Sequence, residues 1–152
     1  MLALHIDLLK FKDKLQIKSV EGIRLVFDSI RRKWIPFSSE EFVRQLFIHY
    51  LVNDRGYPKK WISIEKGIRI NGIYRRYDLA VYNKDMHPQI LIECKSPTLT
   101  ITQDAFDQIL HYNMKMNVPF LVVTNGVKSH CCTIDMAKKG LVFLDEIPKY
   151  NP

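Results

Sequence analysis

The stretch that decides the fold runs from Ile73 to Lys95 and reads IYRRYDLAVYNKDMHPQILIECK. Its β-branched and aromatic residues fall in two runs, Ile73–Tyr82 and Ile90–Lys95, which predicts two strands. The loop between them is short enough to join antiparallel neighbours. We therefore expect Asp78 on the first strand to lie beside Glu93 on the second.

The sequence on both sides adds further helices and strands to this pair. A strand over Trp61–Ile70 precedes it and turns at Asn71-Gly72. The other expected elements are a hairpin of Gln16–Val20 and Ile23–Phe27 around Glu21-Gly22, a helix from Ser38 to about Val52, a helix from Gln103 to about Asn117, a buried parallel strand over Phe120–Thr124, and shorter strands over His130–Asp135 and Leu141–Leu144. This order predicts an α/β domain with a mixed sheet flanked by helices.

Length and composition indicate one ordinary globular domain. The chain has 152 residues, of which 47% are hydrophobic and 26% charged, and this balance excludes a disordered protein. We expect a single domain over residues 1–152, with a lead-in over 1–37 and a core over 38–145. No apolar run approaches the roughly 20 residues of a membrane span, and the first 18 residues lack the apolar stretch of a signal peptide. Three cysteines, two of them adjacent, form no disulfide framework, so we expect a reduced, cytoplasmic protein.

The net charge of +7 is unevenly distributed along the chain. Residues 1–77 carry +8 and residues 78–152 carry −1. A basic half beside a near-neutral half favours a polyanionic partner, nucleic acid first. An ordinary basic surface without a dedicated ligand explains the charge about as well.

The chemistry lies in Asp78 and in Glu93-Cys94-Lys95. Because side chains alternate along a strand, Glu93 and Lys95 share one face and Cys94 points to the other. Two carboxylates and an ammonium on an apolar sheet are costly unless a function uses them. Paired carboxylates suit Mg²⁺, and a nearby lysine can polarise water or stabilise charge on a phosphate. The alternative is a surface Glu–Lys pair with Asp78 in an unrelated turn.

Asp78 followed by Glu93-x-Lys95 resembles the PD-(D/E)xK nuclease signature. The surrounding sequence resembles the N-terminal nuclease domain of type I restriction enzyme R (HsdR) subunits, from about Ser38 to Asp135. The matching segments are Ser39-Glu40-Glu41 with Val43-Arg44-Gln45, Gly56-Tyr57-Pro58, Arg76-Tyr77-Asp78, Glu93-Cys94-Lys95-Ser96-Pro97, Gln108 with Tyr112, and Thr124-Asn125-Gly126. One departure is Tyr77, which stands where the signature has proline.

The resemblance implies a restriction-endonuclease-like fold and Mg²⁺-dependent cleavage of DNA, with Mn²⁺ able to substitute. Asp78 and Glu93 would hold the metal, the main-chain carbonyl of Cys94 would add a ligand, and Lys95 would orient or activate water. Other restriction-modification subunits are implied partners, and a homodimer is one way to cut both strands. The sequence has no GxxxxGK[ST] loop, so we expect no ATP-driven motor within these residues.

Two helices carry the expected supporting residues. Gln108 and Tyr112 lie one turn apart and belong by resemblance to a Gln-x-x-x-Tyr motif that positions DNA or the lysine, although an ordinary amphipathic helix edge has the same spacing. By resemblance Glu41 completes the acidic cluster, but it also has capping-box spacing from Ser38. Arg44 and Gln45 share the face of Glu41 and could meet a phosphate, but a solvated helix face explains them equally well.

Basic residues near the site are the expected DNA contacts. Arg75 and Arg76 are favoured because they immediately precede Asp78, whereas Arg31-Arg32-Lys33 and Lys59-Lys60 fit solvated surface equally well. His130-Cys131-Cys132 is expected to pack in the core, because adjacent strand side chains diverge.

The expected function is therefore a Mg²⁺-dependent endonuclease of this type. The alternatives are a catalytically inactive nucleic-acid-binding or assembly module with the same fold, and a structural domain whose acidic cluster is incidental.

Overall fold

The computed structural model describes residues 2–137 and 140–152. In chain order its 3₁₀-helices (η), α-helices and strands are η1 (Leu8–Lys14), β1 (Ile17–Val20), β2 (Ile23–Asp28), β3 (Lys33–Pro36), α1 (Ser39–Asn53), η2 (Lys59–Trp61), β4 (Ile62–Ile64), β5 (Gly67–Ile70), β6 (Ile73–Arg76), β7 (Leu79–Tyr82), β8 (Pro88–Cys94), α2 (Gln103–Met116), β9 (Phe120–Thr124), β10 (Ser129–Asp135) and β11 (Gly140–Leu144).

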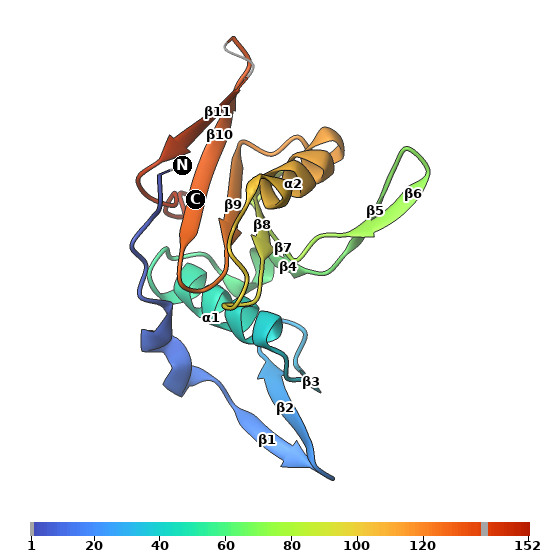
Figure 1. Cartoon of the computed structure of the whole chain (residues 1–152), viewed down its shortest axis with the longest axis vertical. Coiled ribbons are helices and arrows are strands. Elements are labelled where there is room, and N and C mark those ends of the chain that lie inside the picture. The colour runs from blue at the N-terminus through green and yellow to red at the C-terminus, as the bar shows by residue number, and fades with distance from the viewer. Residues whose placement is uncertain (1, 138–139) are drawn as a thin grey trace.

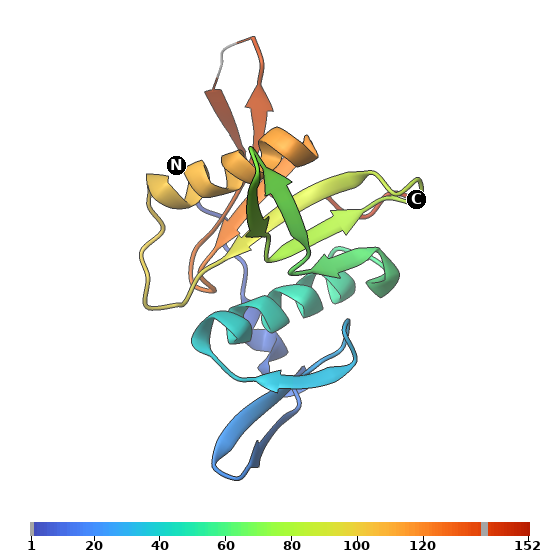
Figure 2. The same ribbon diagram turned by 90° about the vertical axis from the view of Figure 1, so that its right-hand side faces the viewer.

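A mixed six-stranded sheet forms the centre of the molecule, in the order β11-β10-β9-β8-β7-β4 (Figure 1). The neighbours β8 and β9 run parallel, and the other pairs are antiparallel. The helices α1 and α2 lie on opposite sides of this sheet (Figure 2). The predicted mixed sheet flanked by helices and the predicted parallel strand Phe120–Thr124 are both confirmed.

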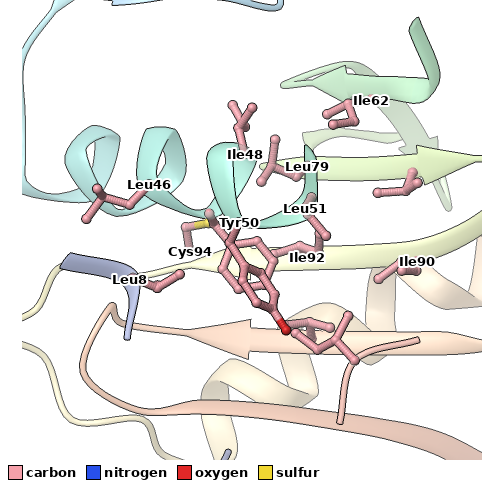
Figure 3. Packing of buried hydrophobic residues seen from close by; sticks show 14 of the residues in the cluster. Leu8, Leu46, Ile48, Tyr50, Leu51, Ile62, Leu79, Ile90, Ile92 and Cys94 are labelled. Atoms are coloured by element: carbon pink, nitrogen blue, oxygen red, sulfur yellow. The ribbon is translucent and has the colours of Figure 1, made fainter. Parts of the chain in front are cut away.

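Alternation along β8 gives the sheet two apolar faces. Ile90, Ile92 and Cys94 pack with the buried residues of α1 (Figure 3). Leu91 points the other way and packs with Phe106 of α2. Both faces are covered by helices, so the middle of β8 is buried throughout.

All three cysteines of the chain are free and buried. Cys131 belongs to the apolar cluster under α1, and the adjacent Cys132 belongs to the cluster under α2. The prediction that His130-Cys131-Cys132 packs in the core is confirmed, because all three residues are buried.

The two strands predicted around Asn71-Gly72 are each broken in the structure, so that prediction was partly wrong. The first breaks at Glu65, which has a positive φ of 47°, and the second breaks between Arg76 and Leu79. The Glu65 N–H donates to the Asp78 main-chain oxygen at 3.1 Å, which keeps the two breaks side by side. The parts farther from the Asn71-Gly72 turn join the large sheet as β4 and β7. The parts next to the turn, β5 and β6, form a separate two-stranded sheet that projects from the body (Figure 1).

The lead-in contains more structure than the predicted hairpin. Strands β1 and β2 pair as expected around Glu21 and Gly22, whose φ angles of 51° and 80° suit a tight hairpin turn. A third strand, β3, pairs with β2, and η1 lies against α1. Neither β3 nor η1 was predicted. The four residues of β3, which include Trp34 and Pro36, are too few to show a strand period. No helix within the described residues is long and apolar enough to cross a membrane.

The beginning of α1 provides a test of local stability. Ser38 is the N-cap, and its side chain accepts a hydrogen bond from the Glu41 N–H at 3.0 Å. We predict that Ser38→Ala lowers the free energy of unfolding by about 1 kcal/mol, because one helix-end donor loses its partner. Urea unfolding followed by circular dichroism measures this loss. Thr102 is the N-cap of α2 but makes no side-chain cap bond, so Thr102→Ala is the matched control, and equal losses in the two variants would contradict the assignment.

Candidate functional site

The antiparallel pairing of β7 with β8 sets the position of the acidic pair. Leu79 pairs with Ile92, so the preceding Asp78 stands next to Glu93 at the ends of these strands. One Asp78 oxygen, Oδ2, accepts a hydrogen bond of 2.7 Å from the Cys94 main-chain N–H. The predicted neighbourhood of Asp78 and Glu93 is therefore present in the structure.

Glu93 is a carboxylic acid held out of water. The residue is only 5% exposed. Burial, reinforced by the negative charge of Asp78, raises the pKa of Glu93 to about 8, although Lys95 acts in the opposite direction. Without a cation, Glu93 therefore retains a proton at neutral pH. A bound divalent ion would replace that proton and neutralise both acids.

Lys95 faces this pair on one side and α2 on the other. Its Nζ lies 3.1 Å from Glu93 Oε1 and donates to Gln108 Oε1 at 3.0 Å. Burial alone would lower the pKa of Lys95, but the neighbouring acidic pair of Glu93 and Asp78 outweighs burial and raises it. The side chain is thus a fixed ammonium held between the Glu93 carboxyl group and the Gln108 amide.

The helix α2 holds both residues of the predicted Gln-x-x-x-Tyr motif at the site. Ala105, Phe106 and Ile109 bury one face of the helix against the sheet. This packing presents Gln108 to Lys95, and the Tyr112 hydroxyl donates to the main-chain oxygen of Arg76. Gln108 therefore positions the lysine, and Tyr112 fixes the backbone two residues before Asp78.

Arg44 of α1 lies on the other side of Asp78 and hydrogen-bonds to three carboxylates, those of Glu41, Glu65 and Asp78. Its Nη1 donates to Glu41 Oε1 at 2.9 Å and to Glu65 Oε1 at 2.7 Å. Its Nη2 donates to Asp78 Oδ1 at 3.1 Å. Arg44 is 3% exposed, so this guanidinium is a buried counter-ion that orients Asp78.

The buried position of Arg44 corrects the prediction for α1. The interpretation of Arg44 and Gln45 as a solvated helix face is wrong, because both residues are buried. A phosphate contact by Arg44 does not fit a guanidinium already surrounded by carboxylates. Ser38 does cap the helix, but the Glu41 carboxylate binds Arg44 and Gln45 and joins the site through Arg44.

Sequence reasoning missed the residues that extend this network into the lead-in. Arg31 contacts the buried Asp28 at 2.7 Å and Glu65 at 3.2 Å, and lies 3.6 Å from Glu41. Glu65 could have been recognised from the sequence, since its carboxylate interrupts the apolar alternation after Ile64. Arg31 was predicted only as part of a basic cluster on the surface.

Arg75 and Arg76, the expected DNA contacts, are exposed on β6. The Arg76 guanidinium lies 4.0 Å from Glu65, at the border of the carboxylate network. Both arginines are therefore exposed, with Arg76 paired at the edge of the carboxylate network.

The donor set suits a hard divalent cation. Among the residues that the structure describes, no cluster of three or more His, Cys, Asp or Glu side chains has the arrangement of a metal site. The expected set uses only two such side chains, Asp78 and Glu93, with the main-chain carbonyl of Cys94. A buried pair of adjacent acids fits such an ion, because oxygen ligands are those that Mg²⁺ prefers.

Comparisons with known proteins find a matching family and a solved structure with a similar fold. A family model described as the type I restriction enzyme R protein N terminus (HSDR_N) matches residues 39–148, more than two thirds of the chain. The fold is similar to that of a solved chain titled "The fragment structure of a putative HsdR subunit of a type I restriction enzyme from Vibrio vulnificus YJ016", with a TM-score of 0.53 and 15% identity. The similarity covers 72% of this chain and 23% of that one. The comparison with curated proteins finds no match.

The raised pKa of Glu93 predicts an unusual pH dependence of stability. Between pH 4.5 and about 8 the folded chain binds one more proton than the unfolded chain, so stability falls as pH rises. Glu93→Gln mimics the protonated acid. In chelator at pH 9 we expect this variant to be more stable than the parent by roughly 2–4 kcal/mol.

Urea unfolding at pH 5 and pH 9 tests this prediction. At pH 5 the two proteins should be alike, because Glu93 is then protonated in the parent. Glu21→Gln, at an exposed turn, is the control and should follow the parent at both values. A parent that is as stable as Glu93→Gln at pH 9 would contradict the buried acid.

Removal of the Arg44 guanidinium should leave three carboxylates without their shared cation. We predict that Arg44→Met lowers the free energy of unfolding at pH 7 by about 3 kcal/mol. The deficit should shrink toward pH 4, because Glu41, whose pKa burial raises, then becomes protonated. Arg75→Met, at an exposed position, is the control and should change stability by less than about 0.5 kcal/mol. A constant deficit across this pH range would instead indicate lost packing.

Proposed function

The chain belongs to the family of type I restriction enzyme R protein N termini, and on that premise we propose that it is a Mg²⁺-dependent endonuclease that hydrolyses DNA phosphodiester bonds. The observation that carries the proposal is the meeting of Asp78, Glu93 and Lys95 at the ends of β7 and β8, with the Lys95 ammonium held between Glu93 and Gln108. Catalysis is assigned to these three residues.

Asp78 and Glu93 would hold the metal, and the Cys94 carbonyl would complete the protein ligands. Bound there, Mg²⁺ or Mn²⁺ supplies Lewis-acid polarisation of the phosphate and a more acidic water. Arg44 orients the Asp78 carboxylate, because it donates to Oδ1 while the Cys94 N–H donates to Oδ2.

Lys95 is better suited to orienting water and stabilising negative charge than to removing a proton. A general base must be deprotonated, whereas Glu93 and Asp78 raise the pKa of this ammonium. Gln108 fixes Nζ at 3.0 Å. A positioned ammonium beside the acidic pair can hold the attacking water and stabilise the charge that develops on the phosphate.

DNA is the proposed substrate. Arg75 and Arg76 are the proposed phosphate contacts, and the charge of +8 on residues 1–77 favours a polyanion. Phosphate contacts position a nucleic acid without reading its sequence. Sequence recognition is therefore assigned to partner subunits of a restriction-modification system.

Nicking of supercoiled plasmid tests the proposal. We expect the 152-residue chain to nick DNA with Mg²⁺ or Mn²⁺ and not in chelator. Asp78→Ala, Glu93→Gln and Lys95→Ala should each lower the rate by at least about 100-fold while DNA binding persists. Asp104→Ala and Lys115→Ala, which remove exposed charges from α2, should cut like the parent.

Two outcomes would refute this mechanism. Binding of DNA without cleavage under either metal would favour the inactive binding module. Cleavage that survives Asp78→Ala would place the chemistry elsewhere. Mg²⁺ should also raise the melting temperature of the parent more than that of Asp78→Ala, because only an intact site couples the ion to folding.

A further inference from the structure

The β5–β6 hairpin is a basic arm beside the candidate site. It forms its own two-stranded sheet and projects from the body of the molecule (Figure 1). The segment from Lys66 to Tyr77 carries four cations and no carboxylate. At its base the Arg76 main-chain oxygen accepts a hydrogen bond from the Tyr112 hydroxyl, and the Tyr77 hydroxyl is hydrogen-bonded to the Ser63 hydroxyl at 2.8 Å. The arm is thus anchored immediately before Asp78.

Strand register divides the arm into two faces. Residues directly opposite each other on paired strands share a face. Ile70 pairs with Ile73, and Ile70 is buried in the cluster formed with α2, so the face that carries these residues is the one nearer α2. Arg69 pairs with Tyr74, and Gly67 pairs with Arg76. These four residues therefore make up the outer face.

Tyr74 lies across Gly67 on this outer face. A Cβ on Gly67 would stand 2.0 Å from the Tyr74 hydroxyl oxygen and 2.2 Å from Cε2 and Cζ, closer than atoms can approach. The missing side chain therefore lets the tyrosine ring lie on the strand. Tyr74 is 60% exposed, so the side of the ring away from the strand is open to solvent.

We propose that Tyr74 is a stacking platform for an unpaired base of DNA, with Arg69 and Arg76 holding the adjoining phosphates. The proposal rests on the proposed function in that DNA is the substrate. Aromatic faces among cations bind single strands, because every base has a π-face and every linkage a negative charge. Tyr74 precedes Asp78 by four residues, at most about 13 Å of extended chain. A base stacked on the platform is therefore held close to the acidic pair.

Equilibrium binding in chelator tests the platform without any cleavage. The probe is a fluorescein-labelled single-stranded oligonucleotide, compared with a blunt duplex of the same sequence and measured by anisotropy on the full chain. Tyr74→Ala should weaken single-strand binding about 5- to 100-fold and affect the duplex much less. Tyr74→Phe keeps the ring and should bind like the parent. Gly67→Val should weaken single-strand binding although Tyr74 is present, because its side chain displaces the ring.

Salt dependence separates the arginines from the tyrosine. Arg69→Ala should reduce the slope of log K against log salt by about 0.7, the contribution of one single-strand phosphate, whereas Tyr74→Ala should leave the slope unchanged. Arg24→Ala, on the exposed part of the β1–β2 hairpin, is the charge control and should bind like the parent.

Three outcomes would overturn the platform. They are unchanged single-strand binding by Tyr74→Ala, an equal loss on single strand and duplex, and a loss in Tyr74→Phe as large as in Tyr74→Ala. Failure of the nuclease proposal is distinguishable from these. If the parent never cleaves but Tyr74→Ala still loses single-strand affinity, only the catalytic assignment fails.

Discussion

The hydrogen bond from the Cys94 N–H to Asp78 is the contact on which the site depends. This bond of 2.7 Å joins the beginning of β7 to the end of β8. The Asp78 side chain accepts it just beyond Leu79 and Ile92, the last residue pair of the β7–β8 ladder. Glu93 and Lys95 flank Cys94 on the same strand, so the bond that fixes Asp78 also sets its distance from both. Burial of Ile92 and Cys94 beneath α1 keeps β8 from shifting by one residue, which would turn Glu93 to the opposite face.

The carboxylates around this bond are balanced by cations from distant parts of the chain. Arg44 belongs to α1, and Arg31 follows β2 in the lead-in. Both contact Glu65, which lies at the break between β4 and β5. A buried charge is tolerated only when it is paired. The lead-in therefore joins the charge network around Asp78 through Glu65, although it lies outside the residues that match the family.

Local patterns predicted the sheet and the three central residues, because both depend on short-range spacing. The alternation of Ile90–Lys95 and the turn before it specify the β7–β8 pair. The resemblance to the Gln-x-x-x-Tyr motif, and not the spacing alone, predicted that Gln108 positions DNA or Lys95. The break at Glu65 was not predictable in this way, since Glu65 has a positive φ and its side chain pairs with Arg44, a partner 21 residues away. Arg44 was assigned to the surface because the sequence of the helix alone does not show that Glu65 and Arg31 contact this side of α1.

The burial of the three thiols has a consequence for the chemistry of the native protein. Burial raises the pKa of Cys94 well above that of a free thiol, and it raises those of Cys131 and Cys132 to about 12 and about 11. Oxidants and alkylating agents attack the thiolate, which these side chains do not form while folded. The Cys94 thiol, which follows Glu93 on β8, is therefore protected from peroxide and alkylating agents as long as the domain stays folded.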